Sequence, residues 1–143
     1  MSTSNVTSNL AAHLAVRDLL DRYTDAINER DWASLEQLFA DGGIWDLRTV
    51  DDQSNQLFEG RQHVASGIRG LVETTQRVIQ MNHAPIIQID GPRATARSTM
   101  HEVSWMHHGI RVTLFGTYHD AMIREDDGEW RFTKRQFRMK HFE

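Results

Sequence analysis

Residues 94–106 read ATARSTMHEVSWM, and after a short turn residues 110–124 read IRVTLFGTYHDAMIR. Both stretches are rich in Thr, Val, Ile and aromatic residues, which are typical of β-strands. Residues 78–90 and 129–140 have the same character. The turns between these four stretches all contain glycine: DGP at 90–92, HHG at 107–109 and DDG at 126–128. Long strands joined by tight turns predict an antiparallel meander.

The chain before residue 78 has a helical character. Apolar residues recur at three to five positions over residues 10–30, which predicts an amphipathic helix. Asp31 is a plausible N-cap for a second, short helix that runs through Phe39 and is ended by DGG at 41–43. A short strand over 44–48 and a third helix over 61–73 complete this half.

Helices that precede a sheet in this way predict an α+β fold. We expect three N-terminal helices packed on a strongly curved antiparallel sheet, because long strands twist and bend. Helices across the concave face would close a cone with an internal pocket. The chain is long enough for one domain, expected over residues 10–143, with a disordered tail at 1–9.

Composition excludes several classes of protein. Of the 143 residues 39% are hydrophobic and 25% charged, which is typical of a globular domain. The formal net charge of −4 argues against a nucleic-acid partner, and the absence of a run of about 18 apolar residues argues against a membrane partner. The lack of cysteine excludes disulfides, thiolate nucleophiles and zinc ribbons. We expect a cytoplasmic protein without metal or cofactor.

Histidines and hydroxyl residues are the remaining candidates for chemistry. His83 stands at the start of an otherwise apolar strand. Thr99 and His101 share one strand face because residues two apart point the same way, and Thr117 and His119 do so on the next strand. Polar pairs on core-facing strands would line a small-molecule pocket. The alternative is that these faces are simply solvated.

The strands also carry more apolar side chains than one helical layer can cover. The residues concerned are Val103, Trp105, Val112, Leu114 and Phe137. A large apolar surface usually marks a contact between proteins. The sequence therefore predicts self-association, as a homodimer or homotrimer.

Several segments resemble those of a known family. They are RYTDAINERDW at 22–32, LFAD at 38–41, FEGR at 58–61, GTYH at 116–119 and DGEWRFTKR at 127–135. Together these resemble the SnoaL-like family of the nuclear-transport-factor-like superfamily, over residues 10 to 142. Within this family the sequence is most similar to scytalone dehydratase, bile-acid dehydratase and hexachlorocyclohexane dehydrochlorinase. The segment RMKHF at 138–142 is similar to the C-terminal tail of the dehydrochlorinase.

The resemblance implies an elimination in which a His–Asp dyad removes a proton. Carried over to this sequence, the histidine falls on His83 and the carboxylate on Asn28. An amide can orient an imidazole and fix its tautomer, but it cannot stabilise an imidazolium as Asp does. His101 or His119 would then donate to a leaving group or an oxyanion, and Leu47 replaces a pocket tyrosine.

The pocket is expected to take a small hydrophobic molecule. Its other lining residues are predicted to be Tyr23, Trp32, Trp45, Thr99, Thr117 and Phe137. Two interpretations follow. One is a dehydratase-type lyase or an isomerase acting on a hydrophobic cyclic or aromatic substrate. The other is a non-catalytic ligand-binding or accessory module with a degenerate dyad, which Asn28 favours.

Overall fold

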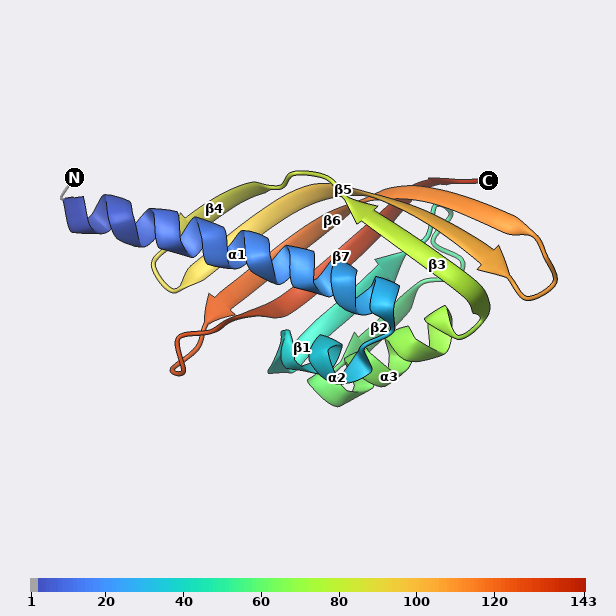
Figure 1. Cartoon of the computed structure of the whole chain (residues 1–143), viewed down its shortest axis with the longest axis horizontal. Helices are drawn as coiled ribbons and strands as arrows, with labels where there is room; N and C mark the ends of the chain where they lie inside the picture. The colour runs from blue at the N-terminus through green and yellow to red at the C-terminus, as the bar shows by residue number, and fades with distance from the viewer. Residues whose placement is uncertain (1–2) are drawn as a thin grey trace.

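The computed structural model describes residues 3–143, with side chains from residue 8 onward. A mixed seven-stranded sheet forms one layer, and three helices pack on one of its faces (Figure 1). The elements in chain order are α1 (Thr3–Glu29), α2 (Trp32–Gln37), β1 (Phe39–Arg48), β2 (Gln56–Glu59), α3 (Arg61–Val72), β3 (Thr75–Asn82), β4 (Ile86–Asp90), β5 (Arg93–Met106), β6 (Arg111–Arg124) and β7 (Trp130–Phe142). The predicted α+β class with three N-terminal helices is confirmed.

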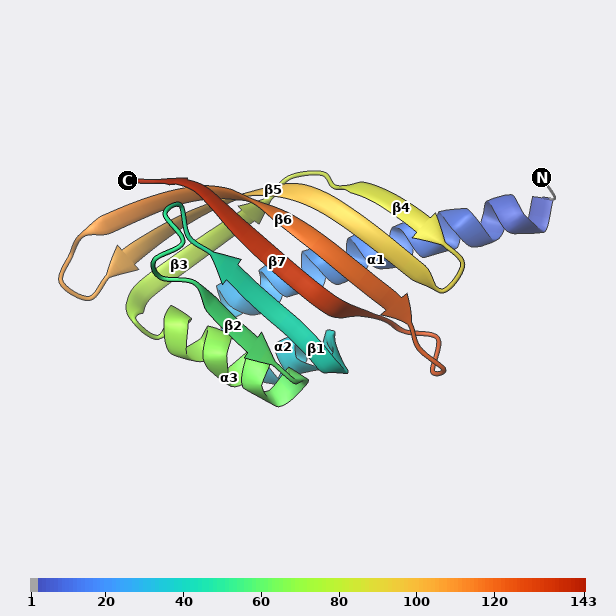
Figure 2. The same cartoon turned by 180° about the vertical axis from the view of Figure 1, so that it is seen from behind.

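The sheet differs from the prediction in two respects. Its order is β2-β1-β7-β6-β5-β3, with β4 also on β5, and β1 runs parallel to β7. The prediction of a wholly antiparallel sheet was therefore wrong, because β1 and β7 are far apart in sequence and no hairpin dictates their direction. The sheet bends gently rather than curling strongly (Figure 2).

The three C-terminal strands were predicted to within two residues at each end. The predicted strand over 78–90 is instead two strands, β3 and β4, which pair with different parts of β5: Asn82 with Met100, and Ile86 with Arg97. The break falls at His83-Ala84-Pro85. Pro85 has no amide proton to donate to a ladder, which explains why pairing stops here.

Helix α1 is longer than predicted and crosses the sheet diagonally (Figure 1). It begins at Thr3, so residues 3–9 of the expected tail are helical, and residues 1–2 lie outside the described part. Leu10 and Leu14, predicted to face the core, are 60% and 69% exposed because this end extends past the sheet. No helix in the described part of the chain is long and apolar enough to cross a membrane.

A cap fixes where helix α2 begins, and a contact with β7 fixes where it gives way to β1. Asp31 caps α2 as predicted, its side chain accepting from the Ser34 amide at 3.1 Å. The helix ends at Gln37, and Phe39 belongs to β1 rather than to the helix. The reason is pairing with β7, in which the Phe132 amide donates to the Leu38 carbonyl at 2.9 Å.

The face of the sheet that meets the helices follows from the alternation along β5. Ala94, Ala96, Ser98 and Met100 are buried, whereas the residues between them are exposed. Since side chains alternate in a strand, the even-numbered positions of β5 point toward the helices. We call this side the inner face and the opposite side the outer face.

Candidate active site

A cavity of about 180 Å³ lies between the inner face of the sheet and helices α1 and α3. Its wall is largely apolar, with Ile68 and Leu71 from α3, Met100 from β5 and Phe137 from β7. Polar atoms enter it at two places, one around Glu102 and the other around Tyr23. An apolar cavity with a few convergent polar groups is the usual form of a small-molecule site.

Glu102 is the carboxylate of this cavity. Gln80 Nε2 donates to its Oε1 at 2.9 Å, and Ser104 Oγ donates to its Oε2 at 3.3 Å. Burial raises the pKa of Glu102 above its usual value, and the hydrogen bonds from Gln80 and Ser104 only partly oppose this. A carboxyl group of raised pKa in a cavity is suited to accept a proton from a bound molecule and to return it.

Gln80 owes its position to Asn28 on α1. Asn28 Oδ1 accepts from the Gln80 amide at 2.7 Å, and Asn28 Nδ2 donates to the Gln80 carbonyl at 3.0 Å. The alternation of β3 then turns the Gln80 side chain inward, next to Glu102. Gln80 Oε1 is buried without a hydrogen-bond partner among the described residues, so it is free to interact with a bound molecule.

Tyr23 and its neighbours form the second polar group. Trp45 Nε1 donates to the Tyr23 hydroxyl at 3.0 Å. The Tyr118 ring meets the Tyr23 ring edge-on at 5.8 Å between centroids. Burial raises the pKa of both tyrosines, whereas the Arg135 guanidinium lowers it.

Arg135 lies behind the two tyrosines, paired with Asp120. Its Cζ is 3.5 Å from the centroid of Tyr118 and 4.1 Å from that of Tyr23. Arg135 Nε lies 3.4 Å from Asp120 Oδ1, and both side chains are completely buried. Burial raises the pKa of Asp120 to about 7, although Arg135 acts against it.

The predicted dyad does not form. His83 is exposed in the β3–β4 connection, and its backbone amide donates to the Thr99 carbonyl at 2.9 Å. Both polar atoms of the Asn28 side chain are engaged by the Gln80 backbone. Within the described residues, the structure shows no hydrogen bond between His83 and Asn28, so that prediction was wrong.

The strand phase was also mispredicted by one residue. Thr99, His101, Thr117 and His119 lie on the outer face, whereas the cavity is lined by their neighbours Met100, Glu102 and Tyr118. A shift of one position moves every side chain of a strand to the other face. The histidines therefore have no place at the cavity.

Three of the residues predicted to line a pocket do line this cavity: Tyr23, Trp45 and Phe137. Leu47 also lines the cavity, whereas Trp32 packs against the core without reaching it. Gln80 and Glu102 were missed. The signal was present in β5, because Ala94, Ala96 and Ser98 are small and alternate with Arg93, Thr95 and Arg97. That pattern marks the even positions as inward.

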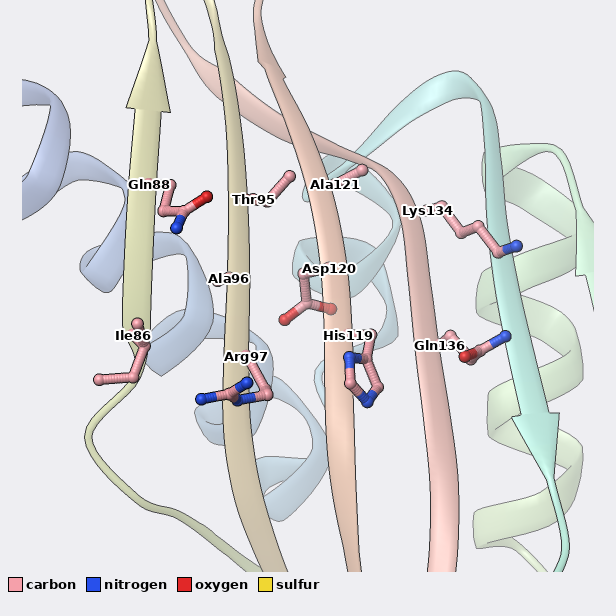
Figure 3. Close-up of a pocket in the computed structure, with 10 residues that line it drawn as sticks. All are labelled: Ile86, Gln88, Thr95, Ala96, Arg97, His119, Asp120, Ala121, Lys134 and Gln136. Carbon is pink, nitrogen blue, oxygen red and sulfur yellow. The ribbon is translucent and has the colours of Figure 1, made fainter.

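His119 instead lines an open hollow of about 530 Å³ on the outer face (Figure 3). Its neighbours there include Arg97 and Gln136. Burial lowers the pKa of His119, and the positive charges of Arg97, Lys140 and Arg138 lower it further.

Asp46 is also buried on the outer face, where its carboxylate accepts from Arg48 at 3.0 Å and from Gln136 at 2.9 Å. Nowhere in the described part do three His, Asp or Glu side chains gather as a metal site would require.

Comparisons with known proteins agree with this architecture. Residues 8–136 match the model of the SnoaL-like domain. No curated protein matches the sequence.

Several solved structures closely resemble this chain in fold. A proposed scytalone dehydratase from Novosphingobium aromaticivorans has a TM-score of 0.82 at 18% identity, over 96% of this chain and 90% of that one. A hexachlorocyclohexane dehydrochlorinase, LinA-type3 from Novosphingobium barchaimii, has a TM-score of 0.82 at 16% identity, over 94% and 90%. A protein of unknown function from Mycobacterium tuberculosis has a TM-score of 0.80 at 22% identity, over 95% and 76%. At these identities the likeness concerns the fold.

Proposed function

We propose, since this chain belongs to the SnoaL-like domain family, that it is a small-molecule lyase or isomerase in which Glu102 moves the proton. Structures named as a dehydratase and as a dehydrochlorinase share its fold. Both names describe an elimination, in which a carbon skeleton loses a small molecule and a base takes up a proton. In this proposal Glu102 has the role of proton acceptor that the sequence suggested for His83.

The surroundings of Glu102 carry this proposal. The cavity wall around it is mostly apolar, so the charged carboxylate is poorly solvated and its basicity is raised. Gln80 and Ser104 each hold one carboxylate oxygen, which fixes the plane of the group while leaving lone pairs for a substrate proton. A positioned base of this kind contributes roughly a hundred- to ten-thousand-fold to a rate.

The cavity limits the size of the substrate. Its volume of about 180 Å³ is below the roughly 300–1,000 Å³ of sites for drug-sized ligands. Phe137, Trp45 and Leu47 offer flat or branched apolar surfaces. The site therefore suits a small hydrophobic molecule of one or two rings, held mainly by burial of its apolar surface.

Deuterium exchange tests this proposal without knowledge of the natural substrate. The probe is 2-tetralone in D₂O, whose exchangeable C–H groups are followed by NMR with wild-type protein, Glu102→Gln and Glu59→Gln. Glu59 is an exposed carboxylate on β2, so its variant is the matched control. We expect wild type and Glu59→Gln to accelerate exchange equally, and Glu102→Gln to lose roughly a hundredfold or more. Equal rates for wild type and Glu102→Gln would refute the role of Glu102.

A ligand-binding module without chemistry is the second candidate. Asn28 and Gln80, two amides, occupy the contact between α1 and β3, and neither can accept a proton as an acid–base pair would. In this case 2-tetralone would bind, as seen from a rise in melting temperature, while its protons exchanged no faster than in buffer. The same samples thus decide between the two functions.

A further inference from the structure

A second hollow, of about 400 Å³, opens beside the C-terminal end of β7. It lies where the loop between β1 and β2, residues 49–55, meets that strand end and the start of β6 (Figure 2). Its wall is mostly apolar and includes Val50, Val112 and Phe142. Among the described residues that line it, Asp51 alone carries a charge. We call this hollow the end groove.

Two side chains line both the end groove and the cavity that holds Glu102. They are Leu114 on β6 and Met139 on β7, and both are half-buried. Because side chains alternate along a strand, Leu114 points to the same face as Tyr118, and Met139 to the same face as Phe137. The cavity and the end groove are therefore neighbouring spaces on the inner face, with these two side chains between them.

We propose that the end groove is the second half of the ligand site. The ring of the ligand lies in the cavity, and an unbranched apolar chain attached to the ring passes between Leu114 and Met139 into the end groove. A methionine side chain is flexible and unbranched, so it yields to such a chain at little cost. The inference deepens the proposed function, on which it rests for the position of the ring.

The residues of the end groove define the chemical class of the chain. The mostly apolar wall favours methylene groups, whose burial is the main source of binding free energy. Asp51 would repel a carboxylate, and no residue that lines the groove offers a positive charge to an anion. The substrate class is therefore a ring compound with a short, uncharged apolar chain.

Continuity with the cavity favours a ligand chain over a protein partner as the occupant. Val50 and Phe142 are 54% and 60% exposed, and such side chains gain from being covered. A protein surface would cover them only from outside. A chain that leaves the cavity between Leu114 and Met139 covers them from within and buries its own methylene groups at the same time.

Binding of alkyl phenyl ketones of increasing length tests this assignment without turnover. The series runs from acetophenone to octanophenone, so that the ring stays the same while the chain grows by CH₂ groups. Isothermal titration calorimetry gives the dissociation constant and the stoichiometry of each complex. We expect one-to-one binding whose affinity rises roughly two- to fourfold with each added CH₂ until the end groove is filled, as burial of a methylene group predicts.

Three variants show where the chain lies. Val50→Ser combined with Phe142→Ser should flatten the rise and leave acetophenone binding unchanged, because these residues line the end groove and not the cavity. The matched control is Leu57→Ser combined with Ile110→Ser, which removes side chains of 54% and 59% exposure that line neither space. This control should keep the rise. Met139→Trp should flatten it by filling the passage.

An affinity that does not rise beyond acetophenone in wild type would overturn the assignment, as would a rise that is equally steep in the Val50→Ser, Phe142→Ser variant. That double variant decides alone if Met139→Trp binds no ketone. A rise with chain length but no deuterium exchange of 2-tetralone would refute the role of Glu102 and support the end groove. Exchange of 2-tetralone without a rise would overturn the end groove alone.

Discussion

The carboxamide of Asn28 holds the backbone of Gln80 at two points, donating to its carbonyl at 3.0 Å and accepting from its amide at 2.7 Å. This contact joins α1 to β3 through two residues that are 52 positions apart. Because the Gln80 side chain then reaches Glu102, the same contact fixes the orientation of the cavity carboxylate.

Asn28→Ala should therefore weaken both the fold and the site. Loss of the two hydrogen bonds leaves a buried strand amide without its partner, at a cost of about 1–3 kcal/mol in the free energy of unfolding. Asn28→Asp should also destabilise, because a carboxylate cannot donate to the Gln80 carbonyl. Urea unfolding measures both effects. A variant as stable as wild type would show that the contact contributes nothing.

Asp120 should make stability depend on pH. Its pKa rises from 3.8 in the unfolded chain to about 7 in the folded protein, so the folded state holds more protons across that interval. The stabilisation is fully present below the lower value and is lost as pH rises toward the upper one, at roughly 1.4 kcal/mol for each pKa unit. The free energy of unfolding, measured by urea at several pH values, should fall through this window.

Asp120→Asn should remove most of that dependence, because the amide does not titrate. Asp126→Asn, in the exposed turn before β7, is the matched control and should keep it. Glu102, whose pKa is also raised, contributes with the same sign and accounts for any remaining slope. An unchanged slope in Asp120→Asn would show that Asp120 is ionised well below neutral pH.

Replacing the exposed histidines should not affect activity. His83 lies in the β3–β4 connection and His119 on the outer face, both away from the cavity. We expect His83→Ala and His119→Ala to exchange the protons of 2-tetralone at the wild-type rate. A hundredfold loss in His83→Ala would instead support the dyad that the sequence suggested.

The helices and the later strands could be predicted because they depend on local signals. Asp31 caps α2 through its own side chain, and glycines at 109 and 128 adopt the positive φ that the turns around them require. The parallel pairing of β1 with β7 could not be predicted in this way, because it joins residues such as Trp45 and Arg135 across most of the chain.

The site was harder to predict because it depends on strand phase. Two polar residues, His101 and Glu102, stand side by side in β5, and only one of them can face the cavity. Because histidine commonly carries protons in enzymes, the odd-numbered positions were predicted to face the cavity. The small residues at 94, 96 and 98 indicated instead that the even-numbered positions face it. The contact between Asn28 and Gln80 could not be predicted for a different reason. Asn28 binds backbone atoms of Gln80, and every residue has the same backbone atoms, so no residue type marks the partner.

Self-association is expected through the outer face rather than through Leu114 and Phe137. Those two residues line the cavity, but Ile79, Met81 and Phe115 are exposed on the outer face. Light scattering should give the mass of a dimer or a trimer for wild type, two or three times the chain mass of 16.6 kDa. Phe115→Asp should reduce it to 16.6 kDa, because a charge in an apolar contact is poorly solvated. A wild-type mass of 16.6 kDa at micromolar concentration would contradict this.

The pH dependence of proton exchange, compared with the titration of Glu102 itself, tests the central claim most directly. The carboxyl carbon of Glu102 is followed by ¹³C NMR, with Glu102→Gln used to assign its signal, and the exchange rate of 2-tetralone is measured in the same buffers. We predict that Glu102 titrates above its usual value of 4.5 and that the rate rises with pH through the same midpoint, because only the carboxylate can accept a proton. A rate that stays constant while Glu102 titrates would contradict the claim.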